Sequence, residues 1–342
     1  MAQIFELPER PRIVTFVSQD TVEQGLARLP YLRALRHGFP SGQLVWLVGH
    51  GPSALRGPLA PLATGLVDRV VDTTPLEGRL SDLLVRPLAG EPVDLVIDGQ
   101  QRLLVTLALK RIRSRHFLST CADYLFSERK PTVRPARNGS DVATLLALLE
   151  LATGAPARPS APLVLTAEVR AAARALLPRG PTYVGLAPGA TDLSRAWPVN
   201  EFVGIARVLA QNGTVPVFLL GPPEQHWHEP IGAAVPTAHF PMQHPSVEHL
   251  GAAPHLAIAL AERLGTVLAN DGALAHAAAA GGAPVVGLYG PTDPARAAPA
   301  VGRVEVLRAQ DYGGDDMSLI PASAVLQAIQ RMLWREDRSR AS

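Results

Sequence analysis

Asp271 and His276 are the polar residues whose setting says most about chemistry in this sequence of 342 residues. They belong to the run Asn-Asp-Gly-Ala-Leu-Ala-His-Ala-Ala-Ala-Ala at 270–280, which predicts the end of a strand, a tight turn at Gly272 and an alanine-rich helix. A helix N-terminus with unpaired amides and small neighbours suits a diphosphate. From the residues alone, a second interpretation is equally open: Asp271 only caps the helix and His276 only packs in the core.

A second polar segment contains Thr191 and Arg195 in the run Gly-Leu-Ala-Pro-Gly-Ala-Thr-Asp-Leu-Ser-Arg-Ala-Trp-Pro at 185–198. Arginine keeps a positive charge and can bind a phosphate through two donors. The alternative is a surface arginine beside a packed Trp197. From the residues alone both interpretations are open.

A third candidate is the loop at 18–25, Ser-Gln-Asp-Thr-Val-Glu-Gln-Gly, which holds the carboxylates Asp20 and Glu23. A carboxylate can accept the proton of a hydroxyl group while that group attacks an electrophile. A glutamate in a loop is, however, usually just solvated.

The first two segments together resemble the C-terminal signature of glycosyltransferase family 9, the ADP-heptose:lipopolysaccharide heptosyltransferases. The resemblance extends through Gly-Pro-Thr-Asp-Pro at 290–294. It implies that Asp271, Gly272 and His276 bind the nucleotide diphosphate of a sugar donor and that Thr191 lies near its phosphates. Arg195 falls where the family has the lysine that neutralises the pyrophosphate, in a chain with only two lysines, so we expect Arg195 to retain that role as a phosphate ligand. Ala273 stands where many members have glycine.

The N-terminal half resembles the family less closely. The run Val-Asp-Leu-Val-Ile-Asp-Gly-Gln at 93–100 matches, but the Gly-Asp pair whose aspartate is the family's general base is absent. Counting from the first strand places the base at Glu23, and counting back from Leu29-Pro30 places it at Gln24. Our expectation is Glu23, with Asp20 as the second candidate.

The resemblance implies an α/β protein of GT-B architecture, with two Rossmann-like doubly wound parallel-sheet domains facing across a cleft. It further implies an inverting, metal-independent transferase that uses no cofactor and moves heptose from ADP-heptose to an anionic glycan or glycolipid such as lipopolysaccharide core. Such an enzyme works in the cytoplasm, in peripheral contact with the inner membrane at most, and needs no nucleic acid. Two alternatives stay open: a family 9 enzyme with another donor or acceptor, and a non-catalytic protein that binds nucleotide sugar or glycan.

Alternating strand and helix patterns run along nearly the whole chain and independently predict parallel α/β sheets. Strands are expected at 12–17, 44–48, 93–98, 183–187, 215–220, 266–269 and 284–289, with helices between them. A Pro-, Gly- and Ala-rich linker at 153–162 separates the predicted domains, residues 1–155 for the acceptor and residues 163–342 for the donor. In such sheets ligands bind at the carboxyl ends of the strands.

Composition fits a globular protein of two domains, with 47% hydrophobic and 18% charged residues. The single cysteine, Cys121, excludes an internal disulfide, and the N-terminus does not have the pattern of a secretory signal. The net charge is +2. The region from Arg102 to Arg137 is strongly basic, which indicates either a solvated helix face or a patch for an anionic acceptor or a membrane surface.

Overall fold

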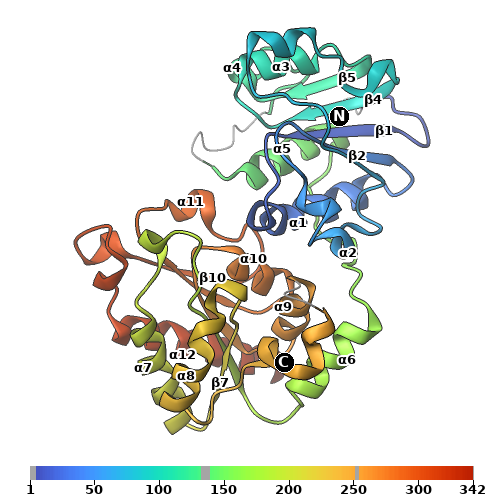
Figure 1. The fold of residues 1–342 in the computed structure, drawn as a ribbon. Coiled ribbons are helices and arrows are strands. Elements are labelled where there is room, and N and C mark those ends of the chain that lie inside the picture. Colours follow the sequence, from blue (N-terminus) through green and yellow to red (C-terminus); the bar gives the residue numbers. More distant parts are fainter. Residues whose placement is uncertain (1–4, 132–138, 251–253, 342) are drawn as a thin grey trace. The chain divides into compact units, whose positions relative to one another are not determined.

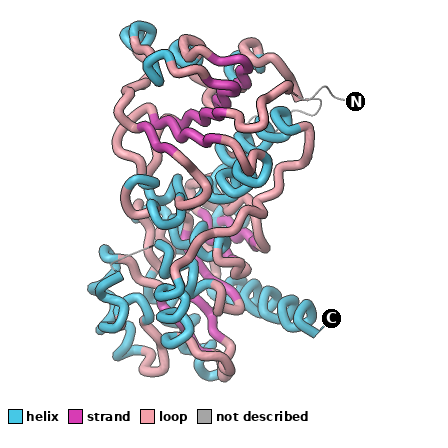
Figure 2. Tube along the Cα trace, turned by 90° about the vertical axis from the view of Figure 1, so that its right-hand side faces the viewer, coloured by secondary structure: helices cyan, strands magenta, loops and turns pink. Residues whose placement is uncertain are grey.

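The computed structural model describes residues 5–131, 139–250 and 254–341, which form two compact units, Met1–Val164 and Leu165–Ser342. Each unit contains one parallel five-stranded sheet among the residues described. Figure 2 shows the strands of each unit in magenta between helices in cyan. The expected α/β class with two Rossmann-like sheets is therefore confirmed.

Unit 1 has the strand order β3-β2-β1-β4-β5. The strands are β1 (Arg12–Val17), β2 (Gln43–Val48), β3 (Arg69–Val71), β4 (Val93–Asp98) and β5 (Ser114–Ser119). The central strands are aliphatic and nearly fully buried, as expected for strands covered on both faces. The direction of winding reverses between β1 and β4, so the loops that follow these two strands diverge at the position where open α/β sheets bind ligands.

The helices of unit 1 cover both faces of its sheet, with α1 and α5 on one side and α3 on the other (Figure 1). They are α1 (Val22–Gly38), α2 (Ala60–Ala63), α3 (Leu103–Leu109), α4 (Cys121–Tyr124) and α5 (Asp141–Thr153). On the α3 side, Val14 and Phe16 of β1 pack with Val105 and Leu109 of α3 in one buried cluster. This packing holds β1 in place, and the loop that follows β1 begins at the carboxyl end of this strand.

Unit 2 has the strand order β10-β9-β8-β6-β7. Its strands are β6 (Tyr183–Ala187), β7 (Val215–Phe218), β8 (Thr266–Asn270), β9 (Val285–Tyr289) and β10 (Val304–Arg308). Its α-helices are α6 (Ala167–Leu176), α7 (Val199–Gln211), α8 (His228–Ala234), α9 (Pro254–Ala261), α10 (Ala273–Ala280), α11 (Pro294–Ala297) and α12 (Ala322–Ala341). The winding reverses between β6 and β8, so the ligand position of this sheet lies between their loops.

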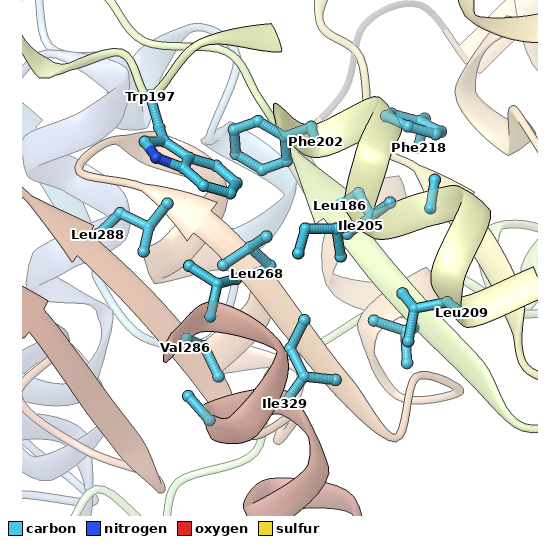
Figure 3. Packing of buried hydrophobic residues seen from close by; sticks show 14 of the residues in the cluster. Leu186, Trp197, Phe202, Ile205, Leu209, Phe218, Leu268, Val286, Leu288 and Ile329 are labelled. Carbon is cyan, nitrogen blue, oxygen red and sulfur yellow. The ribbon is translucent and has the colours of Figure 1, made fainter. Parts of the chain in front are cut away.

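The main core of unit 2 joins the sheet to α7 and α12 (Figure 3). Leu268 and Leu288 of the sheet meet Phe202 of α7 and Ile329 of α12, and the Trp197 indole covers one end of the cluster. The indole Nε1 donates to the carbonyl of Ile320 at 3.0 Å, so the buried ring has a polar partner. Trp197 thereby anchors the segment that precedes α7.

Strands β3, β5 and β10 were not expected from the sequence, and all three lie at sheet edges. Strand β7, expected to reach residue 220, ends at Phe218. Within the described part of the chain, no helix has the length and apolar character needed to cross a membrane.

Candidate functional site

Asn270, the last residue of β8, joins the two loops that meet at the reversal point of unit 2. Its amide Nδ2 donates to the carbonyl of Pro188 at 2.7 Å, and its Oδ1 accepts from the backbone amide of Trp197 at 3.1 Å. One buried side chain therefore holds both ends of the loop between β6 and α7. Asn270 was not predicted to have this role, although its position directly before Asp271 was the available signal.

Arg195 and Asp271 form an ion pair across the same two loops. The guanidinium Nη1 lies 3.1 Å from the Asp271 Oδ2, and the two side chains are 20% and 2% exposed. The structure thus brings together two residues that are 76 positions apart in the sequence. The pair leaves the cation partly accessible at the carboxyl end of the sheet, where it can meet an anion.

Helix α10 begins beside this pair. Its N-cap residue is Gly272, which has no side chain with which to satisfy the first amides of the helix. A Cβ at Gly272 would have no atom within 4 Å, so the space above the helix start is open. Uncapped amides, an open approach and a neighbouring arginine form a site suited to a diphosphate.

His276 lies in α10 and is only 9% exposed. Burial lowers the pKa of His276 to about 4, although the nearby Asp271 carboxylate acts in the opposite direction. The imidazole is therefore neutral at pH 7.

Tyr289 of β9 is fully buried, and its hydroxyl has no hydrogen-bond partner among the described residues. Burial, reinforced by Asp271, raises the pKa of Tyr289 well above its usual range.

Thr191 lies exposed on the loop between β6 and α7. The neighbouring Gly189 is in close contact with Glu224, because a Cβ at residue 189 would lie 2.7 Å from the Glu224 carboxyl carbon. The Glu224 carboxylate also accepts from the amide of Gly221 at 2.9 Å. Glu224 therefore packs against the loop that carries Thr191, at the carboxyl end of the sheet.

In unit 1, the Asp20 carboxylate is turned into the protein and is 2% exposed. It accepts hydrogen bonds from the Ser53 hydroxyl and from the Trp46 indole, the latter at 3.2 Å, and lies 3.4 Å from Arg28. Burial raises the pKa of Asp20, and its bonds to Ser53, Arg28 and Trp46 oppose that rise. Its partners make Asp20 an anchor of the loop.

Glu23 lies in the first turn of α1 and is half-buried. Thr21 and Gln24 form a reciprocal capping box: the Thr21 hydroxyl accepts from the backbone amide of Gln24 at 3.3 Å, and the side-chain Oε1 of Gln24 accepts from the backbone amide of Thr21 at 3.2 Å. Gln24 is therefore engaged in capping. Among Asp20, Glu23 and Gln24, Glu23 is the one with a carboxylate in the first turn of a helix, where the helix dipole stabilises negative charge.

Arg28 holds the Asp20 loop in place, a role that was not predicted. Its guanidinium donates to the carbonyl of Gln19 at 2.6 Å and to the Asp141 carboxylate of α5 at 2.7 Å.

Asp98, the last residue of β4, is also buried, and its carboxylate accepts from the hydroxyls of Thr106 and Ser119. Burial raises the pKa of Asp98 to about 6 against these hydrogen bonds.

Two adjoining hollows lie at the carboxyl end of the unit 1 sheet. One, of about 470 Å³, is lined by residues that include Gln19, Thr21, Val22, His50 and Pro52. The other, of about 380 Å³, is lined by Ser18, Gln19, His50, Leu76, Glu77 and Arg102. Gln19 and His50 line both hollows, so the two adjoin. We call the two hollows together the path, and its larger part reaches Thr21 and Val22 at the start of α1.

The basic region proposed for the acceptor does not gather at this path. Lys110, Arg111 and Arg113 lie just before β5, at the amino end of the sheet, whereas the path lies at its carboxyl end. Arg134 and Arg137 lie outside the described residues. Among the described residues of this region, Arg102 lines the path, whereas Lys110, Arg111 and Arg113 lie at the opposite end of the sheet.

No group of three or more His, Cys, Asp or Glu side chains in the described ranges has the arrangement of a metal site. The histidines between residues 226 and 255 thus do not form such a cluster.

The model of "Glycosyltransferase family 9 (heptosyltransferase)" matches residues 83–318. No curated protein sequence shows significant similarity to the chain. Among solved structures, the glycosyl transferase family 9 protein from Veillonella parvula DSM 2008 is 17% identical with a TM-score of 0.68, covering 95% of this chain and 97% of its own.

Two Escherichia coli structures are also similar. ADP-heptose lps heptosyltransferase II is 19% identical with a TM-score of 0.61, and covers 95% of this chain and 99% of its own. Heptosyltransferase WaaC, solved with ADP-2-deoxy-2-fluoro heptose, is 19% identical with a TM-score of 0.63, and covers 94% and 99%. At these identities the similarity shows a shared two-domain fold.

Proposed function

Because the chain belongs to glycosyltransferase family 9 and is a glycosyltransferase, we propose that it transfers heptose from ADP-heptose to a glycan acceptor such as lipopolysaccharide core. The donor binds unit 2 and the acceptor binds unit 1. The observation that carries the proposal is the uncapped start of α10 beside the Arg195–Asp271 pair. The E. coli WaaC structures with ADP and with a fluorinated ADP-heptose support this choice of donor.

In the proposed donor site, the first amides of α10 and the Arg195 guanidinium receive the diphosphate. Thr191 adds a hydroxyl donor from the neighbouring loop, and Asp271 accepts from a hydroxyl of the sugar or ribose. Gly272 supplies the open start of the helix, and His276 completes the donor site as a neutral side chain, since its pKa is about 4. Negative charge grows on the leaving diphosphate during transfer, so these donors stabilise the transition state more than the ground state.

The proposed reaction is a single displacement that inverts the anomeric centre without a metal ion. Glu23 accepts the proton of the acceptor hydroxyl, the oxygen of that hydroxyl attacks the anomeric carbon, and the bond to the diphosphate breaks. Asp20 acts as a positioning residue, because its carboxylate is already bonded to Ser53, Trp46 and Arg28. We also propose that the reaction takes place in the cytoplasm, as the family resemblance implies.

The donor site is tested by thermal shift with ADP, GDP, UDP and CDP. Ligand at 100 times its dissociation constant stabilises by about 2.7 kcal/mol, so we expect a clear rise in melting temperature with ADP. Asp271→Asn and Arg195→Gln should abolish it. The matched controls Glu305→Gln and Arg331→Gln break an exposed pair elsewhere in unit 2 and should keep the ADP response. Preference for another nucleotide would contradict ADP-heptose, and no response to any would contradict the site.

The base is tested by turnover of ADP-heptose with a lipopolysaccharide-core acceptor. Glu23→Gln should lower kcat by about 10²–10⁴-fold, the usual contribution of a general base, and should leave the ADP thermal shift unchanged. Full activity in Glu23→Gln would remove Glu23 from the mechanism. Donor binding without transfer by the wild-type protein on any tested acceptor would favour the non-catalytic alternative.

A further inference from the structure

A cavity of about 510 Å³ lies at the amino end of the unit 2 sheet. Its walls are the loop 178–183 between α6 and β6, three residues between α9 and β8, and Leu333 of α12. Strands β6 and β8 begin at this cavity and end at the proposed donor site, so the two lie about 15 Å apart at roughly 3.3 Å per residue. The cavity is therefore separate from the donor site, and its volume is that of a small-molecule site.

Arg263 lines this cavity with a guanidinium that is held in place. The side chain is half-buried, and its Nε donates to the carbonyl of Leu177, the C-cap residue of α6. The two terminal nitrogens have no hydrogen-bond or ion-pair partner among the described residues. One nitrogen thus anchors the group on the end of a helix, and the other two form a planar fork that suits an oxyanion.

Arg179 and Gly180 extend this positive wall from the loop before β6. Arg179 is exposed and forms no ion pair with a described residue. Gly180 has a φ of +129°, which favours glycine, and a Cβ there would have no atom within 4 Å. The backbone amides of both residues donate to no described residue. Unpaired amides on an open backbone, next to two guanidinium groups, make a concave surface that binds anions.

Glu262 is the only acidic residue among the described residues that line the cavity. Its carboxylate lies 3.5 Å from the guanidinium of Arg170 in α6, so its charge is partly compensated from outside the cavity. A carboxylate accepts hydrogen bonds and donates none, so Glu262 suits the hydroxyl groups of a ligand. Thr182 adds a hydroxyl that both donates and accepts. The wall therefore combines cations for an anionic group with acceptors for hydroxyl groups.

We propose that this cavity binds a small phosphate monoester that also carries hydroxyl groups, as a sugar phosphate does. The phosphate lies between Arg179 and Arg263, with an oxygen toward the amide of Gly180, and a hydroxyl group of the ligand donates to Glu262. A phosphate monoester carries a charge of about −1.5 to −2 at pH 7, which matches two guanidinium groups. The inference does not depend on the proposed function, because the nucleotide sugar binds at the other end of β6 and β8.

The test is isothermal titration calorimetry of the full-length protein with glucose 6-phosphate, inorganic phosphate and glucose. Glucose 6-phosphate should bind most tightly, inorganic phosphate more weakly, and glucose without detectable heat. Arg179→Gln should raise the dissociation constant of glucose 6-phosphate about tenfold, because it removes one charge-assisted contact, and Arg179→Gln/Arg263→Gln about a hundredfold. Arg207→Gln is the matched control and should bind as wild type does: Arg207 is an exposed arginine of α7 whose Nε likewise donates to a carbonyl, that of Ala234.

Two further variants separate the parts of the proposed contact. Glu262→Gln should weaken binding of glucose 6-phosphate but not of inorganic phosphate, because only the sugar phosphate has hydroxyl groups on a carbon chain to donate to the carboxylate. Arg195→Gln, in the proposed donor site, should leave both affinities unchanged. Urea denaturation of each variant shows whether Arg263→Gln lowers stability, and Arg179→Gln tests the site in either case because Arg179 is exposed.

Four results would overturn the inference: no binding of glucose 6-phosphate by wild type, equal binding by Arg179→Gln, loss of binding in Arg195→Gln, or equal affinities for glucose 6-phosphate and inorganic phosphate. The third would assign the ligand to the donor site, and the fourth would leave a site for simple anions only. Because none of these titrations contains ADP, failure of this cavity and failure of the donor site are distinguishable.

Discussion

Replacing His276 by glutamine should remove a pH-dependent loss of stability from unit 2. Burial lowers the pKa of His276 from 6.5 to about 4. Below pH 6.5 the unfolded chain therefore takes up a proton that the folded chain refuses until the pH is near 4. Wild type loses free energy of unfolding as the pH falls through this window, and this contribution is flat above it.

The size of the effect follows from the shift. At 1.36 kcal/mol for each pKa unit, a shift of roughly 2.5 units corresponds to about 3 kcal/mol between pH 7 and pH 4. His276→Gln can be less stable at every pH because of altered packing. Its stability relative to wild type should nevertheless rise by about 3 kcal/mol on acidification, because the variant has no proton to take up at this position.

The assay is urea denaturation at several pH values from 4 to 7, followed by tryptophan fluorescence. Three of the four tryptophans, Trp197, Trp227 and Trp334, belong to unit 2. His249→Gln, which removes an exposed histidine of the same unit, is the control and should follow the wild-type profile. A difference between His276→Gln and wild type that stays constant from pH 7 to pH 4 would refute a buried, neutral His276.

Five other substitutions test how single side chains contribute to the stability of the two units. Burial raises the pKa of Asp98 in unit 1 from 3.8 to about 6, so the free energy of unfolding of wild type should fall by about 3 kcal/mol as the pH rises from 3.8 to 6. Asp98→Asn should abolish this fall, and urea denaturation at pH 4 and pH 7 measures it. Arg28→Met removes the partner of the Asp20 and Asp141 carboxylates and should cost about 3 kcal/mol of unfolding free energy. Arg69→Met, at the exposed pair with Glu91, should cost less than about 1 kcal/mol, and equal losses in denaturant would contradict the role of Arg28. Gly204→Ala, in open space within α7, should stabilise by up to about 1 kcal/mol. Gly281→Ala should lower the melting temperature, because its Cβ would collide with the backbone carbonyl oxygen of Ile258.

The central strands could be predicted because burial on both faces leaves an uninterrupted apolar run in the sequence. Val14 in β1 and Val96 in β4 are fully buried parts of such runs. The missed strands β3, β5 and β10 are edge strands, and each exposes part of its length to solvent. Arg69 of β3 and Arg115 of β5, for example, are exposed and interrupt the pattern.

The two candidate sites differed in how far the sequence could describe them. Asp271, Gly272 and His276 occupy one short segment, so their placement around the start of a helix could be predicted from spacing. The Arg195–Asp271 contact and the role of Asn270 depend on strand order, which spacing does not contain. The environment of Asp20 was also out of reach, because Ser53, Trp46 and Arg28 come from three other segments.

The reversal of strand order in unit 2 has a consequence for a chain that emerges from the ribosome. Residues 188–197 are synthesised early in this unit, but their anchors on Asn270 and Asp271 follow 73 to 82 residues later. Strand β8 must then insert between β6 and the later β9. Such long-range pairings form only after the intervening chain is available. A nascent chain that ends before residue 270 therefore lacks both anchors of the proposed donor site, which can form only when most of unit 2 has been made.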